Sequence, residues 1–217
     1  MKKSLITLAL LVTLLSCSPK PQSEGPSILE NQICGKSCWN NVILGKTDTQ
    51  EFLNIVTTLP NVAQSSIHSY DELNQQLFDE RITFQYYRDS GEEVNVLART
   101  KKQQVVLITF QGGLGLTFDD IVKIFGEPDF ATSLWTFDGG INVHFINSLE
   151  GVEVTSYFES EKSSITPTLE INSFTLFDPN IYQTLIDTDY IIADHEYSIL
   201  YPWTGYGVVE QKYWPPE

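Results

Sequence analysis

The sequence has 217 residues, of which 41% are hydrophobic and 19% charged, so it is long enough for one domain with a sizeable core or for two small fused domains. Its 28 acidic residues outnumber its 13 basic residues and give a formal net charge of −15. A chain this negative is repelled by phosphates, which excludes nucleic acid and disfavours anionic lipid surfaces as partners. The acids are scattered, which is typical of a solvated surface; a cationic partner is the functional alternative.

Residues 1–17 have the layout of a bacterial lipoprotein signal peptide. Lys2 and Lys3 form a short basic region, and an apolar run follows over residues 5–15. The run is too short for a transmembrane helix, which needs about 20 apolar residues. It ends in Leu-Leu-Ser before Cys17, a pattern that resembles the lipobox, in which the Cys is acylated and becomes the new N-terminus. We therefore expect Cys17 to anchor the protein through lipid to the extracytoplasmic face of a bacterial membrane, inner or outer.

Residues 18–33 are predicted to form a flexible tether. The first ten of these positions are rich in Pro, Ser and Gly and show no apolar periodicity. Such a segment buries too little apolar surface to offset the entropy that ordering would remove. We expect it to set the distance between the membrane and the domain.

Cys34 and Cys38 are the remaining cysteines of the chain. An oxidising compartment outside the cytosol favours a disulfide between them, which would close a tight loop. A metal site or a redox pair is the alternative, but the CxxxC spacing is neither that of a zinc ribbon nor that of thioredoxin. The sequence therefore predicts a structural disulfide.

Two segments of the domain begin in the same way, which predicts two tandem modules. Residues 44–60 and 114–128 each open with a Gly turn and with a Thr, Thr47 or Thr117, that is suited to cap a helix. Each segment continues with apolar residues at helical spacing and ends at a Pro. The boundary between the modules is expected near residues 112–113.

The residues after each helix have the alternation of strands. The first module has a second predicted helix over Tyr70–Phe78, followed by strands at 82–87, 94–100 and 105–110; the second module has strands at 133–137, 141–146 and 152–159. Helices followed by antiparallel strands predict the α+β class, with short helices packed on an antiparallel sheet in each module. The expected domains are residues 34–112, residues 113–165 and an aromatic-rich C-terminal extension at 166–217, which has a helix near 179–186.

Part of this pattern resembles a known group. Gly115-Leu-Thr-Phe-Asp-Asp-Ile-Val-Lys-Ile-Phe-Gly-Glu-Pro128, with the hairpin at 134–146, is similar to the BamE and beta-lactamase inhibitor protein group of small extracytoplasmic folds. Cys34-Gly-Lys-Ser-Cys38-Trp39, followed by a Gly-x-Thr, also resembles bacterial lipoproteins of unassigned role built from two such modules. The first module departs from the pattern, since Leu59-Pro60-Asn61 replaces the Gly-x-Pro stop. The resemblance covers residues 34–160 and implies a scaffold that holds other proteins rather than one that does chemistry.

The sequence offers few groups for catalysis. His68, His144 and His195 lack metal-binding spacing, and His144 alternates with apolar residues in a predicted strand, so we expect it to face solvent. The best candidates for holding a cation are five residues that lack the EF-hand spacing: Asp187, Asp189, Asp194, His195 and Glu196. We predict no enzymatic activity, no metal and no cofactor.

Aromatic residues are concentrated in the C-terminal extension. Tyr201, Trp203, Tyr206 and Trp214 are the candidate partner surface among them. Tyr and Trp are enriched where proteins bind partners, but large rings also fill cores. Core packing and a partner or glycan surface therefore both remain open.

Two functions follow from these patterns. The first is a non-catalytic protein–protein interaction or assembly module, held at the membrane by lipid and bound to another envelope protein. The second is a cell-wall or carbohydrate-binding protein, or a small hydrolase, that uses the C-terminal acids and aromatics. A concave arrangement of Asp187, Asp194 and Glu196 beside Trp203 would favour the second function, and dispersed acids would favour the first.

Overall fold

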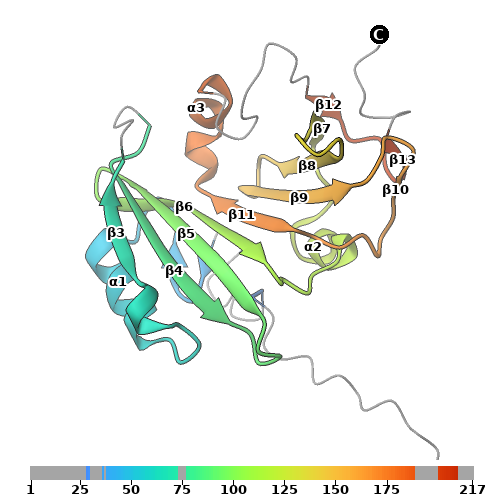
Figure 1. Cartoon of the computed structure of the whole chain (residues 1–217). Helices are drawn as coiled ribbons and strands as arrows, with labels where there is room; N and C mark the ends of the chain where they lie inside the picture. The colour runs from blue at the N-terminus through green and yellow to red at the C-terminus, as the bar shows by residue number, and fades with distance from the viewer. Residues whose placement is uncertain (1–27, 30–35, 37, 73–76, 189–199, 210–217) are drawn as a thin grey trace, which may run out of the picture.

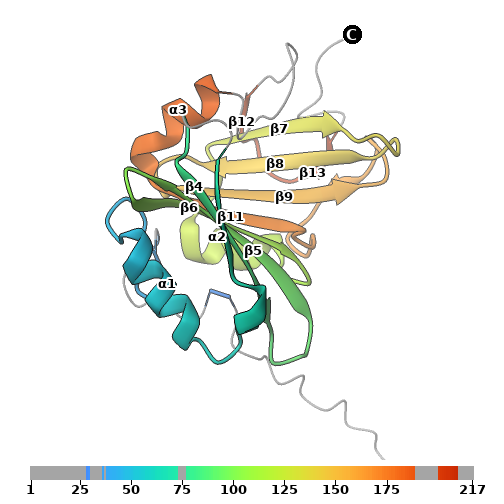
Figure 2. The ribbon, with the colours of Figure 1, turned by 60° about the vertical axis from the view of Figure 1, so that its left-hand side comes forward.

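One antiparallel sheet of nine strands organises the chain (Figures 1 and 2). The computed structural model describes residues 28–29, 36, 38–72, 77–188 and 200–209. The strand order across the sheet is β12-β7-β8-β9-β11-β6-β5-β4-β3, and every neighbouring pair is antiparallel. The strands are β3 His68–Asp71, β4 Glu80–Tyr87, β5 Glu93–Lys101, β6 Gln104–Gly112, β7 Phe130–Trp135, β8 Ile141–Asn147, β9 Val152–Phe158, β11 Ser173–Phe177 and β12 Tyr201–Pro202.

The predicted α+β class with two tandem helix-on-sheet modules is wrong. The strands expected for the two modules form one sheet, because β11 lies between β6 and β9 and pairs with both. Phe174 of β11, for example, lies opposite Phe110 of β6 on one side and Val154 of β9 on the other. This central strand comes from the segment expected to be a C-terminal extension. The α-helices of the described residues are three short ones, α1 Thr49–Thr58, α2 Phe118–Phe125 and α3 Tyr182–Asp187.

The local elements agree better with the sequence than the architecture does. The six predicted strands correspond to β4–β9, although β7 begins three residues earlier and ends two residues earlier than expected. The predicted helix over Tyr70–Phe78 is wrong, since Tyr70 and Asp71 belong to β3 and pair with Arg81 and Glu80. The helix expected near 179–186 is confirmed as the 3-10 turn η2, Pro179–Ile181, followed by α3.

Helix capping explains where α1 and α2 begin. Thr117 caps α2 as expected, and Asp120 completes a capping box by accepting from the Thr117 backbone N–H at 2.9 Å. Thr47 does not cap α1, because its hydroxyl accepts from the Ile43 N–H at 2.8 Å. The cap of α1 is instead Asp48, whose carboxylate accepts from the Glu51 N–H.

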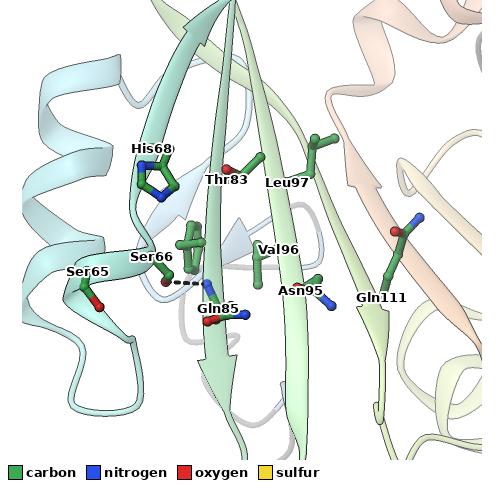
Figure 3. Close-up of a pocket in the computed structure, with 10 residues that line it drawn as sticks. Ser65, Ser66, His68, Thr83, Gln85, Asn95, Val96, Leu97 and Gln111 are labelled. Atoms are coloured by element: carbon green, nitrogen blue, oxygen red, sulfur yellow. Dashed lines mark hydrogen bonds between the residues drawn. The ribbon is translucent and has the colours of Figure 1, made fainter.

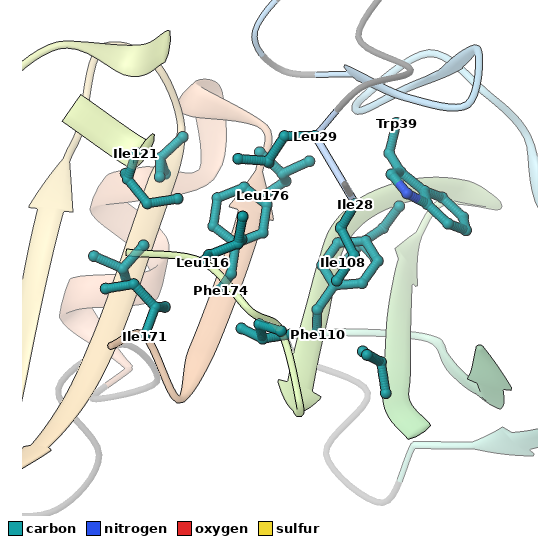
Figure 4. Close-up of a cluster of buried hydrophobic side chains, with 14 of the residues drawn as sticks. Ile28, Leu29, Trp39, Ile108, Phe110, Leu116, Ile121, Ile171, Phe174 and Leu176 are labelled. Carbon is teal, nitrogen blue, oxygen red and sulfur yellow. The ribbon is translucent and has the colours of Figure 1, made fainter. Parts of the chain in front are cut away.

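The main core lies between one face of the sheet and the helices α1 and α2 (Figure 4). Phe52 of α1 and Phe125 of α2 are both fully buried in the same cluster. Phe174 of β11 connects the two halves, because its ring lies 5.9 Å from Phe110 and 5.7 Å from Phe125. Buried area is continuous across the domain, so the two helices share one hydrophobic core.

A smaller core covers one end of the opposite face. There α3 and its preceding turn pack on the sheet through Leu185, which is fully buried with Leu107, Ile146 and Phe177. The rest of this face carries neither α1 nor α2. No helix of the described residues is both long and apolar enough to cross a membrane.

The first described residues are tied into the main core. Ile28 and Leu29 are buried, and Ile28 lies beside Phe110 (Figure 4). Trp39 lies in the small hairpin of β1, Cys38–Trp39, and β2, Val42–Ile43, and packs edge-on against Phe110 at 5.3 Å. Cys38 is disulfide-bonded. Its expected partner Cys34 lies outside the described residues, so the pairing stays a prediction.

Candidate functional site: the polar outer face of the sheet

The face opposite α1 and α2, here called the outer face, carries two rows of polar side chains. Because successive strand residues point to opposite faces, the strand pairing fixes which residues share a row. The first row runs across the sheet through His68, Thr83, Leu97, Thr109, Thr175 and Glu153. The second row runs beside it through Gln85, Asn95, Gln111, Ser173, Thr155, His144 and Thr132.

These two rows are nearly neutral although the chain is strongly acidic. Glu153 is the one carboxylate among the thirteen positions of the two rows, and it is paired with His144. The other positions carry hydroxyls, amides, His68 and a single Leu. Thr109, Thr132, Glu153 and Thr175 of these rows are buried. The remaining hydroxyls and amides are at least partly exposed and can exchange hydrogen bonds rather than charges with a partner.

A pocket of about 570 Å³ opens at one end of these rows (Figure 3). Its polar lining comes from five elements and includes Ser65, His68, Thr83, Gln85, Asn95 and Gln111. Leu97 lies beside Thr83 in the lining (Figure 3). Phe84 also lines the pocket but is only 2% exposed, since its ring belongs to the main core.

The short 3-10 helix η1, Gln64–Ser66, forms one wall of the pocket and is fixed to β4. Ser66 Oγ accepts from the Gln85 N–H at 2.8 Å and donates to the Ala63 carbonyl at 2.6 Å. The Ala63 N–H in turn donates to the Gln85 carbonyl at 3.0 Å. The wall therefore satisfies the backbone N–H and carbonyl of Gln85 at a point of β4 where β3 no longer pairs with it.

The three amide side chains that line the pocket differ in their hydrogen bonding. Gln85 Nε2 donates to Glu93 Oε1 at 2.8 Å, which holds that side chain in place. Asn95 and Gln111 are exposed, and their side chains make no hydrogen bond within the part of the chain that the structure describes. These two amides each offer donors and an acceptor to a bound molecule.

His144 and Glu153 form a second polar group farther along the outer face. His144 Nδ1 lies 2.6 Å from Glu153 Oε1 and 3.2 Å from Thr155 Oγ1, and both partners are on β9. The expectation that His144 faces solvent is wrong, because its side chain is largely buried. Since the carboxylate and the hydroxyl approach the same ring nitrogen, this geometry does not align the Thr155 hydroxyl with Nε2, as a nucleophile activated by a His would require.

Two of the four residues predicted as a partner surface, Tyr201 and Trp203, are packed into the domain. Trp203 lies 5.4 Å from Phe118 and 5.6 Å from Phe145, and Tyr201 packs partly buried against the same core. Tyr206 contacts Trp203 but is exposed. Burial, with the charges of Asp119 and Glu127, raises the pKa of the Tyr206 phenol. Of the two open alternatives, core packing describes Tyr201 and Trp203.

Other predicted site residues are not brought together within the described residues. Asp187 ends α3, whereas the other four members of the acidic group, residues 189 and 194–196, lie outside the described residues, as do Trp214 and the lipidation site Cys17. Among the residues that the structure describes, no three His, Cys, Asp or Glu side chains gather as metal ligands.

The sequence did not predict the pocket, although the alternation of two predicted strands indicates part of its lining. The predicted strands at 82–87 and 94–100 alternate apolar with polar residues, and this pattern already puts Thr83 and Gln85 on one face and Asn95 and Leu97 on one face. The alternation could not predict the pocket wall, because η1 is held by hydrogen bonds to β4 nearly twenty positions later.

Comparison of the chain with protein-family models, curated proteins and solved structures finds no match.

Proposed function

We propose that the protein is a lipid-anchored extracytoplasmic protein that binds, without catalysis, an extended segment of another envelope protein in the pocket of the outer face. The lipobox-like Cys17 and the tether support the anchored location. The neutral amide and hydroxyl lining of the pocket is the observation that carries the binding function. Its volume of about 570 Å³ lies within the range of roughly 300–1,000 Å³ that ligand pockets occupy.

The chemistry of the lining favours a polypeptide. Peptide groups present one donor and one acceptor per residue, and the amides of Asn95 and Gln111 offer both in return. The lining holds no carboxylate, so a neutral segment enters without the repulsion that the rest of this acidic chain imposes on anions. Leu97 supplies an apolar contact for one side chain of the segment.

The alternative occupant is a glycan, and the pocket supports it less. Sugar rings stack on the flat apolar faces of aromatic side chains. Apart from His68, the one aromatic residue in the lining is Phe84, and its ring is buried in the core. Trp203, which the sequence offered as a stacking residue, packs against Phe118 and Phe145. The protein-binding function therefore stands ahead of the carbohydrate-binding one.

Site-specific photocrosslinking in cells tests this function. A photoreactive amino acid is placed at Asn95 in the full-length lipoprotein, and a second form carries it at Thr57, which is exposed on α1 at the opposite face. We expect one protein adduct at position 95 and none at position 57. A protease-resistant, glycosidase-sensitive adduct at position 95, or the same adducts at both positions, would show that the proposal is wrong.

Two glutamine variants make the test specific for the pocket. Gln111 lines the pocket at one end of β6, and Gln104 is also exposed, at the other end of the same strand. We expect Gln111→Ala to abolish the adduct at position 95 and Gln104→Ala to leave it. Equal yields from the two variants would contradict a role for the pocket amides.

A further inference from the structure

Two arginines lie directly opposite each other on the outer face. Arg81 of β4 pairs with Arg99 of β5 in the strand register. Thr83 and Leu97 are the opposite pair in the pocket lining (Figure 3). Arg81 precedes Thr83 by two residues, and Arg99 follows Leu97 by two. Since side chains two residues apart on a strand share a face and lie about 7 Å apart, the arginines form the next row of the outer face, at the border of the pocket.

This row is covered on the side of β6 and bordered by Tyr70 on the side of β3. Leu107 of β6 lies opposite Arg99 and packs in the smaller core beneath α3. The guanidinium carbon of Arg99 lies 5.2 Å from the centre of the Phe78 ring, which belongs to the same core. Tyr70 lies opposite Arg81 and is 45% exposed. A ligand that reaches this row from the pocket therefore meets Arg81 before the covered end.

The two guanidinium groups differ in their partners. Arg99 Nε donates to Glu72 Oε1 at 2.8 Å, and both side chains are 17% exposed. The guanidinium carbon of Arg81 lies 5.2 Å from the centre of the Tyr70 ring. Among the described residues, Arg81 pairs with no carboxylate, and its Nε is buried without a hydrogen bond. The sequence has no acid at positions 73–78, next to Glu72.

The lack of a carboxylate at Arg81 is unfavourable for the folded sheet. Like charges directly opposite on antiparallel strands are destabilising, and Glu72 offsets the charge of Arg99 alone. The chain has 28 acidic residues, so an acid could have occupied a neighbouring position. A local choice that costs stability is expected where a functional site requires it. We infer that the positive charge of Arg81 is kept for a ligand.

The surroundings of Arg81 favour a carboxylate as that ligand. A guanidinium binds carboxylate or phosphate through a planar fork of N–H donors. The adjacent pair of Arg99 and Glu72 shows that this row accommodates a carboxylate in a partly buried place. A phosphate group carries up to two negative charges, so Glu72 and the net charge of −15 repel it more strongly. One carboxylate matches the single charge of Arg81.

We propose that Arg81 binds the carboxylate of an Asp or Glu side chain in the extended segment that occupies the pocket. An extended segment advances about 3.3 Å per residue, so a side chain two residues from the one over Thr83 lies over Arg81. The recognised segment is a neutral polar stretch with one acidic residue beside it. The inference rests on the proposed function and names the feature by which the partner is recognised.

Selection from a library of displayed random peptides tests this contact. The full-length, lipidated protein in detergent and its Arg81→Gln variant select from the same library. We expect the peptides selected by wild type to share an Asp or Glu at one position, and those selected by Arg81→Gln to lack this preference. Peptides without a shared acid, or the same preference in both proteins, would refute the carboxylate contact and leave peptide binding standing. If neither protein selects a peptide, the proposed function fails and the contact fails with it.

Affinities of one selected peptide and its amide counterpart, in which Asn or Gln replaces the acid, measure the contact. Loss of a charge-assisted hydrogen bond corresponds to about tenfold or more in affinity. We expect Arg81→Gln to weaken the acidic peptide by about this factor and to leave the affinity of the amide peptide unchanged, by fluorescence anisotropy. The control is Lys102→Gln, because Lys102 is exposed in the β5–β6 turn and its loss changes the net charge equally. Equal weakening by the two variants would show a general charge effect and contradict the contact.

Two further measurements separate the contact from other roles of Arg81. Because Arg81→Gln also removes the repulsion from Arg99, we expect its midpoint in urea unfolding to be no lower than that of wild type. A lower midpoint with equal losses for both peptides would instead assign Arg81 a structural role. Acetate should displace the acidic peptide at a lower concentration than inorganic phosphate does, and the reverse order would refute a carboxylate site.

Discussion

Replacing Phe174 with Ala tests whether the two halves of the sheet unfold as one unit. Phe174 is fully buried on the central strand β11, and its ring contacts Phe110 from the first half and Phe125 from the second. Removing a buried Phe side chain destabilises a protein by about 3–5 kcal/mol through lost burial and the cavity left behind. Because the residues around Phe174 come from both halves, the loss is expected in both halves at once.

The magnitude can be turned into a measurable shift. A change of about 4 kcal/mol corresponds to a melting temperature lower by about 8–16 °C in a domain of this size. We expect one cooperative transition in wild type and in Phe174→Ala, with the same midpoint by tryptophan fluorescence and by far-ultraviolet circular dichroism. The fluorescence reports on both halves, since Trp39 lies in the first and Trp203 packs on the second.

The matched control is Phe137→Ala, which removes the same atoms from a fully exposed position. We expect it to change stability by less than about 0.5 kcal/mol. Two separate transitions in wild type, or a variant in which one transition shifts and the other does not, would refute the single sheet and restore two independent modules.

Three further changes have defined outcomes in urea unfolding. Burial raises the pKa of Asp120, but hydrogen bonds from the hydroxyl and amide of Thr117 outweigh it, so the net pKa is lowered. Asp120→Asn should therefore lower stability at pH 7, and the difference from wild type should shrink below the unfolded pKa of about 3.8 and be lost as the pH falls through the lowered pKa of the folded state. Glu153→Gln should cost about 1–3 kcal/mol, because it weakens the largely buried contact with His144. Gly45→Ala should cost more than about 1 kcal/mol, since Gly45 has a φ of +76°; an unchanged midpoint in any of these variants would contradict the corresponding contact.

The sequence predicts local elements well where the signal is local. The hairpin of β8 and β9 follows from alternation, and α2 follows from a capping residue and apolar spacing within a few positions of each other. The helix predicted over Tyr70–Phe78 fails because Tyr70 and Asp71 pair with β4, a contact that outweighs the local preference.

The architecture depends on a choice of strand partners that local patterns do not encode. β11 is five residues long and reads as one more short apolar run, yet it joins β6 to β9. The same limit applies to the site. His144 lies nine positions from Glu153, and the pair forms because the hairpin register puts Glu153 diagonally across from His144, next to its direct partner Thr155. The pocket depends on η1 reaching β4, which is again a contact between segments apart in sequence.

The central strand β11 lies in the last fifth of the sequence, so the sheet cannot be completed without this part of the chain. Thr109 of β6 and Thr175 of β11 form a buried hydrogen bond across 66 positions. During synthesis, β6 therefore cannot pair with β11 until about four fifths of the sequence has been made. A chain truncated before Ser173 would carry two bare strand borders, one on β6 and one on β9. Such borders are templates for pairing between molecules. A premature stop in this region should therefore yield aggregates rather than a smaller folded protein.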